Sequence, residues 1–338
     1  MTNDIMVVKN TEIQTVEPTV NGLFDVFMSY LQASEKTKAT YTRALRQYSR
    51  WINDNNIVAP TRKDVIAWLD SLAAEHKAPT TIASYLSAVK QLYKFAADAG
   101  LYDEITRNVK APLKVDTDVY RKDALSAGQA AICLDKIETD TSKGRRDYTI
   151  FLLMSTCGLR CIEVQRADIE DLRTAGGKTV LYVQGKGKTE KTRFVVVPQE
   201  VEAAIRASLA DRKNVSGSAP LFTSDSNHNA GGRLTTRSIS RIAKGRMIDA
   251  GFNSDRLTAH SLRHCAVDTA ISEGESLEAA QTFARHSDPK TTMIYVHSRE
   301  RVDNSCSQTV YKAISRQRNK DKVRARREQQ AAAEHISA

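Results

Sequence analysis

The second half of the chain carries four short groups of residues whose types suit phosphate chemistry. They are Gly158-Leu159-Arg160 with Glu163, Gly185-Lys186-Gly187, His260-Ser261-Leu262-Arg263-His264, and His286 followed by Tyr295. Arginines can hold a phosphate, a lysine and a histidine can transfer protons, and a tyrosine hydroxyl can attack phosphorus. These groups therefore predict cleavage of a phosphodiester bond without a metal ion.

His260 and Arg263 lie three residues apart in a segment with helical periodicity, so their side chains share one face of a helix. His264 follows at a spacing that places it near His260. Two histidines four residues apart can bind zinc, but Ser261 stands where the zinc-protease pattern has glutamate, and the cation at position 263 would repel Zn²⁺. We expect neither a metal nor a cofactor.

Arg160 and Glu163 lie at the predicted start of a helix. Gly158 is expected to end the preceding helix, and Glu163 falls in the first turn of the next one. The functional interpretation places Arg160 on a phosphate, with Glu163 orienting it through a charged hydrogen bond. The alternative is an ordinary joint between two helices with a solvent-exposed arginine.

Lys186 lies between two glycines in a basic segment that separates two β-rich runs. A flexible hairpin tip would let this lysine reach a phosphate, although Lys188 is a rival for the same role, and a mobile basic turn without a function is the alternative. Tyr295 would need positive surroundings to act as a nucleophile, because tyrosine ionises near pH 10. A tyrosine considered by itself is far more often part of a core.

The order Arg, Lys, His-x-x-Arg, His, Tyr resembles the pattern of the tyrosine recombinases, the phage integrase family, over about residues 22–300. The segment Lys290-Thr291-Thr292-Met293-Ile294-Tyr295 is similar to the nucleophile segment of that family. One departure is Arg285, which precedes His286 where many relatives have glycine. This departure concerns the local backbone geometry and leaves the histidine in place.

The resemblance implies a role for each residue. Arg160 and Arg263 would bind the non-bridging oxygens of the scissile phosphate, and Lys186 would protonate the leaving 5′-oxygen. His260 would be the acid–base partner of Tyr295, and His286 would donate a hydrogen bond to the phosphate. Tyr295 would form a 3′-phosphotyrosyl bond and release a 5′-hydroxyl.

The function implied by the resemblance is site-specific recombination of double-stranded DNA, as integration, excision or dimer resolution. Relatives work as tetramers that exchange a C-terminal segment, which here begins beyond about residue 300. Two alternatives are a type IB topoisomerase, which relaxes supercoils through a similar tyrosine, and a catalytically silent DNA-binding regulator on the same fold.

The composition agrees with a DNA partner. The chain has 338 residues, enough for two domains, and a net charge of +10, which favours a polyanion. No apolar run is long enough to span a membrane, and the N-terminus lacks a secretion signal. The five cysteines form no Cys-x-x-Cys pair, which suits a reducing compartment. We therefore expect a cytoplasmic protein.

The pattern of apolar residues predicts a mainly α protein with a small β-sheet. We expect a flexible segment over residues 1–20, a helical core-binding domain over 21–112, a linker over 113–122, a catalytic α+β domain over 123–315 and a basic tail over 316–338. Six basic residues are candidate DNA contacts: Arg43, Arg46, Arg50, Lys90, Lys94 and Lys188. Each of them could equally belong to a solvated surface.

Overall fold

The computed structural model describes residues 5–9, 12–16, 20–112, 123–185, 187–213, 215–303 and 306–336. The chain divides into two compact units, residues 1–117 and 118–338. The predicted linker, residues 113–122, and Lys186 lie outside the described residues. Within those residues no helix combines the length and the apolar character that crossing a bilayer requires.

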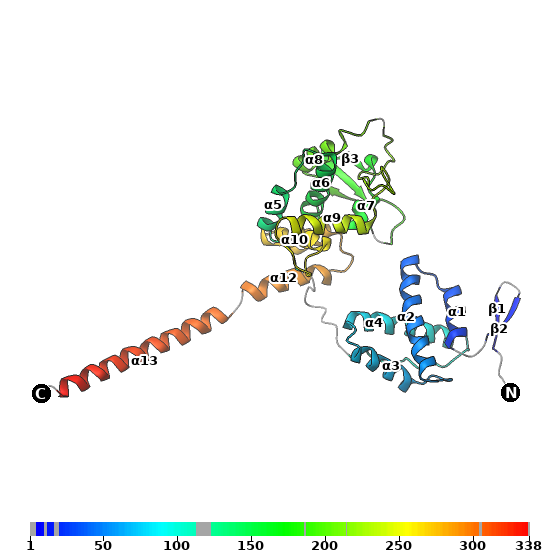
Figure 1. The fold of residues 1–338 in the computed structure, drawn as a ribbon, viewed down its shortest axis with the longest axis horizontal. Coiled ribbons are helices and arrows are strands. Elements are labelled where there is room, and N and C mark those ends of the chain that lie inside the picture. Colours follow the sequence, from blue (N-terminus) through cyan, green and yellow to red (C-terminus); the bar gives the residue numbers. More distant parts are fainter. Residues whose placement is uncertain are drawn as a thin grey trace. The chain divides into compact units, whose positions relative to one another are not determined.

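The first unit is built mainly from four helices (Figure 1), as the sequence predicts. They are α1 (Val20–Tyr30), α2 (Glu35–Asp54), α3 (Arg62–Ala74) and α4 (Pro79–Asp98). An antiparallel pair of strands, β1 (Ile5–Lys9) and β2 (Glu12–Val16), precedes them. The prediction of a flexible segment over residues 1–20 is wrong for these two strands. Their β-branched residues favour extended backbone, but each run is too short for a clear pattern.

The core of the first unit follows from apolar residues at helical spacing. In α2, Ser34 caps the first turn, and the buried Leu45, Tyr48 and Ile52 recur along one face. Tyr48 packs edge-on against Trp68 of α3, and its hydroxyl lies 3.0 Å from that of Tyr93 in α4. The two buried hydroxyl groups therefore satisfy each other within an otherwise apolar core.

The second unit is mostly helical with one small sheet, which confirms the predicted fold class. Strands β3 (Leu172–Ala175), β4 (Lys178–Val183) and β5 (Arg193–Val196) pair antiparallel in that order. The helices are α5 (Ala127–Asp135), α6 (Ser142–Thr156), α7 (Cys161–Arg166), α8 (Gln199–Leu209), α9 (Thr236–Asp249), α10 (Ala259–Ser272), α11 (Leu277–Ala284), α12 (Lys290–Asp303) and α13 (Ser307–Ile336).

Two elements of the second unit were not predicted. Strand β3 has four residues with little alternation, and its place in the sheet depends on pairing with β4. Helix α5 is nine residues long and begins with a Ser126 capping box. The segment predicted as a basic tail continues α13 as far as Ile336.

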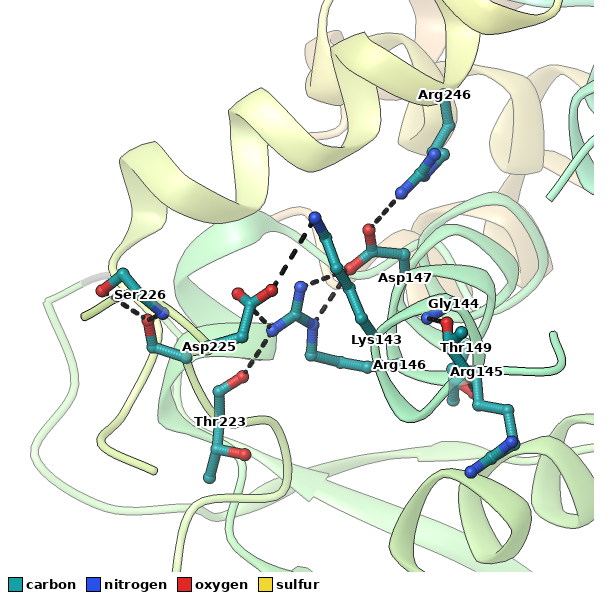
Figure 2. Close-up of polar contacts among 12 residues, drawn as sticks. Lys143, Gly144, Arg145, Arg146, Asp147, Thr149, Thr223, Asp225, Ser226 and Arg246 are labelled. Carbon is teal, nitrogen blue, oxygen red and sulfur yellow. Dashed lines mark hydrogen bonds and ion pairs between the residues drawn. The ribbon is translucent and has the colours of Figure 1, made fainter. Parts of the chain in front are cut away.

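Helix α6 lies at the centre of the second unit and packs against α8 and α10. A polar network near the N-terminus of α6, drawn in Figure 2, joins this helix to α9 and to the loop that precedes α9. Arg146 donates to Asp147 at 2.8 Å and to Asp225 at 2.9 Å, while Arg246 of α9 donates to the other oxygen of Asp147 at 2.6 Å. Because Asp147 is buried, these bonds fix α9, and hence the chain leading into α10, against α6.

A second network holds the connection between β4 and β5, which carries the predicted lysines. Lys191 donates to Asp168 at 2.6 Å and also to Asp171, and Arg233 donates to the other oxygen of Asp168 at 2.5 Å. Arg166 donates to the carbonyl of Gly185 at 3.0 Å. The two ends of this connection are therefore anchored to the body of the unit. Its tip, including Lys188, is exposed.

Candidate active site

The turn between α6 and α7 provides the backbone around which the site is built. Gly158 has φ +60°, which favours glycine, and a Cβ at this position would lie 3.3 Å from the ring of Phe283, a tight contact that leaves little room for a side chain. Its carbonyl oxygen accepts hydrogen bonds from Arg263 and from Arg285. This single carbonyl joins the α6–α7 turn to α10 and to the end of α11.

Arg160 and Glu163 lie where the sequence placed them, at the first turn of α7. The Glu163 carboxylate accepts from the Arg160 backbone N–H at 2.8 Å and from Arg160 Nη1 at 3.0 Å. Glu163 is 1% exposed, whereas the side chain of Arg160 is 28% exposed and reaches solvent. Burial alone would raise the pKa of Glu163, but the guanidinium groups of Arg285 and Arg160 outweigh it, so the pKa lies below its ordinary value.

Arg263 is almost completely buried and donates from its two terminal nitrogens to the carbonyls of Gly158 and Ala284. These two bonds use two of its five N–H donors and leave the others for an anion. Burial and the nearby guanidinium groups of Arg160 and Arg285 lower its pKa. Arg263 is thus a buried cation among other cations, an arrangement that a bound anion would stabilise.

Arg285 was noted in the sequence as a departure from the family pattern but was not predicted to be a site residue. It ends α11 with a left-handed backbone, φ 54° and ψ 40°, which is the conformation that glycine adopts most easily. Arg285 therefore keeps the turn that the glycine of the family pattern would form. Its side chain, 5% exposed, points into the site and pairs with Glu163 at 2.9 Å. The signal in the sequence was an arginine where the pattern of the family that the sequence resembles often has glycine.

Tyr295 of α12 is buried, with 3% of its surface exposed, and packs with Val267 and Ala284. Its hydroxyl oxygen lies 2.5 Å from Nδ1 of His264. The family resemblance predicts His260 as the acid–base partner of Tyr295. In the structure His264 contacts both residues, since its ring centroid is 4.5 Å from that of His260 and 5.5 Å from that of Tyr295.

His286 follows Arg285, and its Nδ1 lies 2.8 Å from the hydroxyl of the fully buried Thr292, one turn before Tyr295 in α12. This contact orients the imidazole and was not predicted from the sequence. Burial and the guanidinium groups of Arg263, Arg160 and Arg285 lower the pKa of His286 to about 3. Burial, with His260 and Arg263 nearby, lowers the pKa of His264 to about 3 as well. Both rings are therefore neutral at pH 7.

Two family descriptions match the chain. The phage integrase family matches residues 125–301, and the phage integrase N-terminal SAM-like domain matches residues 24–100. The tyrosine recombinase XerC of Pseudomonas fluorescens is 30% identical over 288 residues, which cover 83% of this chain and 92% of that protein. The chain belongs to the phage integrase family. It is a site-specific recombinase of the tyrosine type, as the sequence predicts.

Other relatives of this recombinase agree with the assignment. The tyrosine recombinase XerD of Caulobacter vibrioides is 30% identical over 68% of this chain and 75% of its own length. The Tn1549 transposon integrase, solved with a circular intermediate DNA, shares the fold with a TM-score of 0.67 at 18% identity, over 82% of this chain and 94% of that one. XerH bound to its palindromic difH substrate has a TM-score of 0.63 at 18% identity, over 88% and 84%.

The recombinase thus brings Arg160, Arg263, His260, His286 and Tyr295 into one site. Lys188 lies apart from them on the exposed tip of the β4–β5 connection. Three guanidinium groups, those of Arg160, Arg263 and Arg285, surround one carboxylate, that of Glu163. The resulting excess of positive charge suits a phosphate group. The neutral His264 lies against Tyr295, and the neutral His286 lies near Arg263. Each ring can accept a proton or donate a hydrogen bond.

Proposed function

We propose that Tyr295 is the nucleophile and that the surrounding cations hold the scissile phosphate of duplex DNA. The observation that carries this proposal is the bond between the Tyr295 hydroxyl and the neutral His264, beside the guanidinium of Arg263. Arg160 and Arg263 would bind the non-bridging oxygens, and His286 would donate a hydrogen bond to one of them. Fixed cations stabilise the charge that grows on these oxygens in the transition state.

In the reaction, the Tyr295 oxygen gives its proton to the histidine pair, His264 and His260, and forms a bond to phosphorus. The bond from phosphorus to the 5′-oxygen breaks, and that oxygen receives a proton from Lys186, with Lys188 as the alternative donor. The products are a 3′-phosphotyrosyl bond and a free 5′-hydroxyl. Attack by a 5′-hydroxyl of a second duplex reverses the same steps and joins the new strands without an external energy source. Because Tyr295 and Arg263 are both buried, α12 must shift relative to α10 before a DNA phosphate can reach them.

The test is the capture of the covalent intermediate on a nicked suicide duplex, which prevents religation. Tyr295→Phe should form no covalent adduct while binding DNA nearly as well as the parent. Tyr182→Phe is a matched control, because this half-buried tyrosine lies in the sheet, where its ring packs at a tilted angle against Phe194. Normal adduct formation by Tyr295→Phe, or its loss in both variants alike, would refute the assignment.

The basic residues of the first unit are proposed to contact the DNA backbone. Arg43, Arg46 and Arg50 are exposed on α2, Lys94 is exposed on α4, and Lys90 is half-buried. Such cations release condensed counterions when they reach phosphates, so DNA affinity should fall steeply with salt. Lys188, exposed on the β4–β5 connection, is proposed as a further contact. With duplex DNA as the substrate, the cytoplasm stays the proposed compartment.

A homo-tetramer on DNA, assembled by exchange of α13, is proposed for the active complex. The side chains of Val310, Tyr311 and Ile314 gather near the start of α13 and are each more than half exposed. A groove of about 670 Å³ in the second unit, lined mainly by alanines of α5, α10 and α11 together with Phe283, would accept these side chains from a neighbouring copy. Glu273 and Glu275 line the same groove and complement the basic character of α13.

Point changes test this assembly without truncation. Ile314→Asp should abolish the tetramer on DNA, as measured by analytical ultracentrifugation, because the charge would enter an apolar groove. Val323→Asp makes the same change at an equally exposed site further along α13 and should leave the assembly intact. A tetramer that survives Ile314→Asp would contradict the proposed exchange.

A further inference from the structure

Arg285 adds a third guanidinium to the site at a backbone position suited to glycine. Its φ of 54° is unfavourable for any residue with a Cβ, so the side chain must gain contacts that hold the turn. The turn itself is regular, since the backbone N–H groups of Arg285 and His286 donate to Thr282 and Gln281 at the end of α11. The backbone of this turn is therefore the one that glycine would adopt, and Arg285 differs from glycine only in its side chain.

The Arg285 side chain uses its donors inside the protein. Nη2 donates to Glu163 and to the Gly158 carbonyl, both at 2.9 Å, and Nη1 donates to the Phe283 carbonyl at 2.7 Å. With a further bond from Nε to Glu163 at 3.5 Å, Arg285 uses four of its five N–H donors inside the protein, twice as many as Arg263, so its guanidinium is committed to the protein and is not presented to DNA. It joins the turn that carries Arg160 to the turn that carries His286.

The two arginines share both oxygens of the Glu163 carboxylate. One oxygen accepts from the Arg160 backbone N–H and from Arg285 Nη2, and the other accepts from Arg160 Nη1. When Arg160 turns its guanidinium toward a phosphate, its contact with Glu163 weakens. Without Arg285, this movement would leave the buried Glu163 carboxylate without a cation. Because an unpaired buried charge is very unfavourable, Glu163 would then hold Arg160 back from the phosphate.

We propose that Arg285 is a positioning residue that keeps Glu163 neutralised and so leaves the Arg160 guanidinium available to the scissile phosphate. This inference rests on the proposed function, in which Arg160 binds that phosphate. Arg160 suits such a movement because it is the most exposed of the three arginines, with 28% of its side chain open to solvent. Arg285 thereby raises the cleavage rate without touching the substrate.

The experiment measures single-turnover cleavage of the suicide duplex and, separately, DNA affinity. Arg285→Gly restores the residue that best fits the turn, and it should slow cleavage on the order of 10- to 100-fold while changing affinity less than about twofold. Arg285→Lys keeps the charge without the forked geometry and should recover part of the rate. Arg256→Ala, which removes one exposed positive charge from a surface pair with Asp123, serves as the control.

The double variant Glu163→Gln/Arg285→Gly distinguishes charge neutralisation from simple support of the turn. If Arg285 neutralises Glu163, removing the carboxylate charge as well should make the double variant faster than Arg285→Gly. Cleavage by Arg285→Gly at the parent rate would overturn the proposal, and so would a double variant no faster than Arg285→Gly. A parent protein that forms no adduct would instead refute the proposed function itself.

Discussion

Glu163→Gln tests how much the second unit depends on one buried carboxylate. Each oxygen of Glu163 accepts from Arg160 and from Arg285, with distances of 2.8 to 3.5 Å. Whichever way the glutamine amide turns, its NH₂ group faces two N–H donors. Removing one partner of a buried ion pair costs about 3–5 kcal/mol. For a unit of roughly 220 residues this predicts a fall in Tm of roughly 6–20 °C.

The assay is calorimetric unfolding of the full chain, with tryptophan fluorescence as an internal reference. Both tryptophans, Trp51 and Trp68, lie in the first unit, so fluorescence follows that unit alone. Glu163→Gln should lower the transition of the second unit and leave the fluorescence transition unchanged. Glu170→Gln, the same chemical change at an exposed site, should shift neither by more than about 0.5 kcal/mol.

The pH dependence gives this prediction a second check. The pKa of Glu163 is lower in the folded protein than in the unfolded chain. Its stabilising contribution is therefore complete above the unfolded pKa and is lost as the pH falls through the folded one. The difference between parent and Glu163→Gln should shrink in that acidic range. A difference of less than 1 kcal/mol at pH 7 would show that the three arginines do not need this carboxylate.

Three further predictions follow from the same site and from the first unit. The folded pKa values of His264 and His286, both about 3, lie below the unfolded value, so the second unit should lose roughly 3 kcal/mol between pH 6.5 and pH 5 in denaturant titrations, about half of it through each ring; a flat profile would contradict this. Thr292→Val should release the His286 ring and slow cleavage about tenfold with DNA affinity unchanged, whereas Thr292→Ser should retain the parent rate. Arg46→Ala should reduce the slope of log affinity against log salt by about 0.9, and an unchanged slope would remove Arg46 from the interface.

Much of the fold could be predicted because its signals are local. Apolar residues at helical spacing located α1 to α4, and Gly158 marked the end of α6 by its conformational freedom. The start of α7 followed from the capping relation between Arg160 and Glu163, which are three residues apart. Each of these features depends on a few neighbouring residues, and their spacing alone determines which side chains share a face.

The sequence by itself singled out Arg160, Arg263, the histidines and Tyr295 as candidates, together with the helices and turns that carry them, but it did not single out the side chain of Arg285. Only the tertiary structure decided their partners, because those contacts join distant segments. Arg285 meets Glu163 across 122 residues, and Arg263 meets Gly158 across 105. The choice of His264 over His260 for the hydrogen bond to Tyr295 likewise depends on how α12 packs against α10. Local spacing defines the faces of a helix, but the packing of whole elements determines what each face meets.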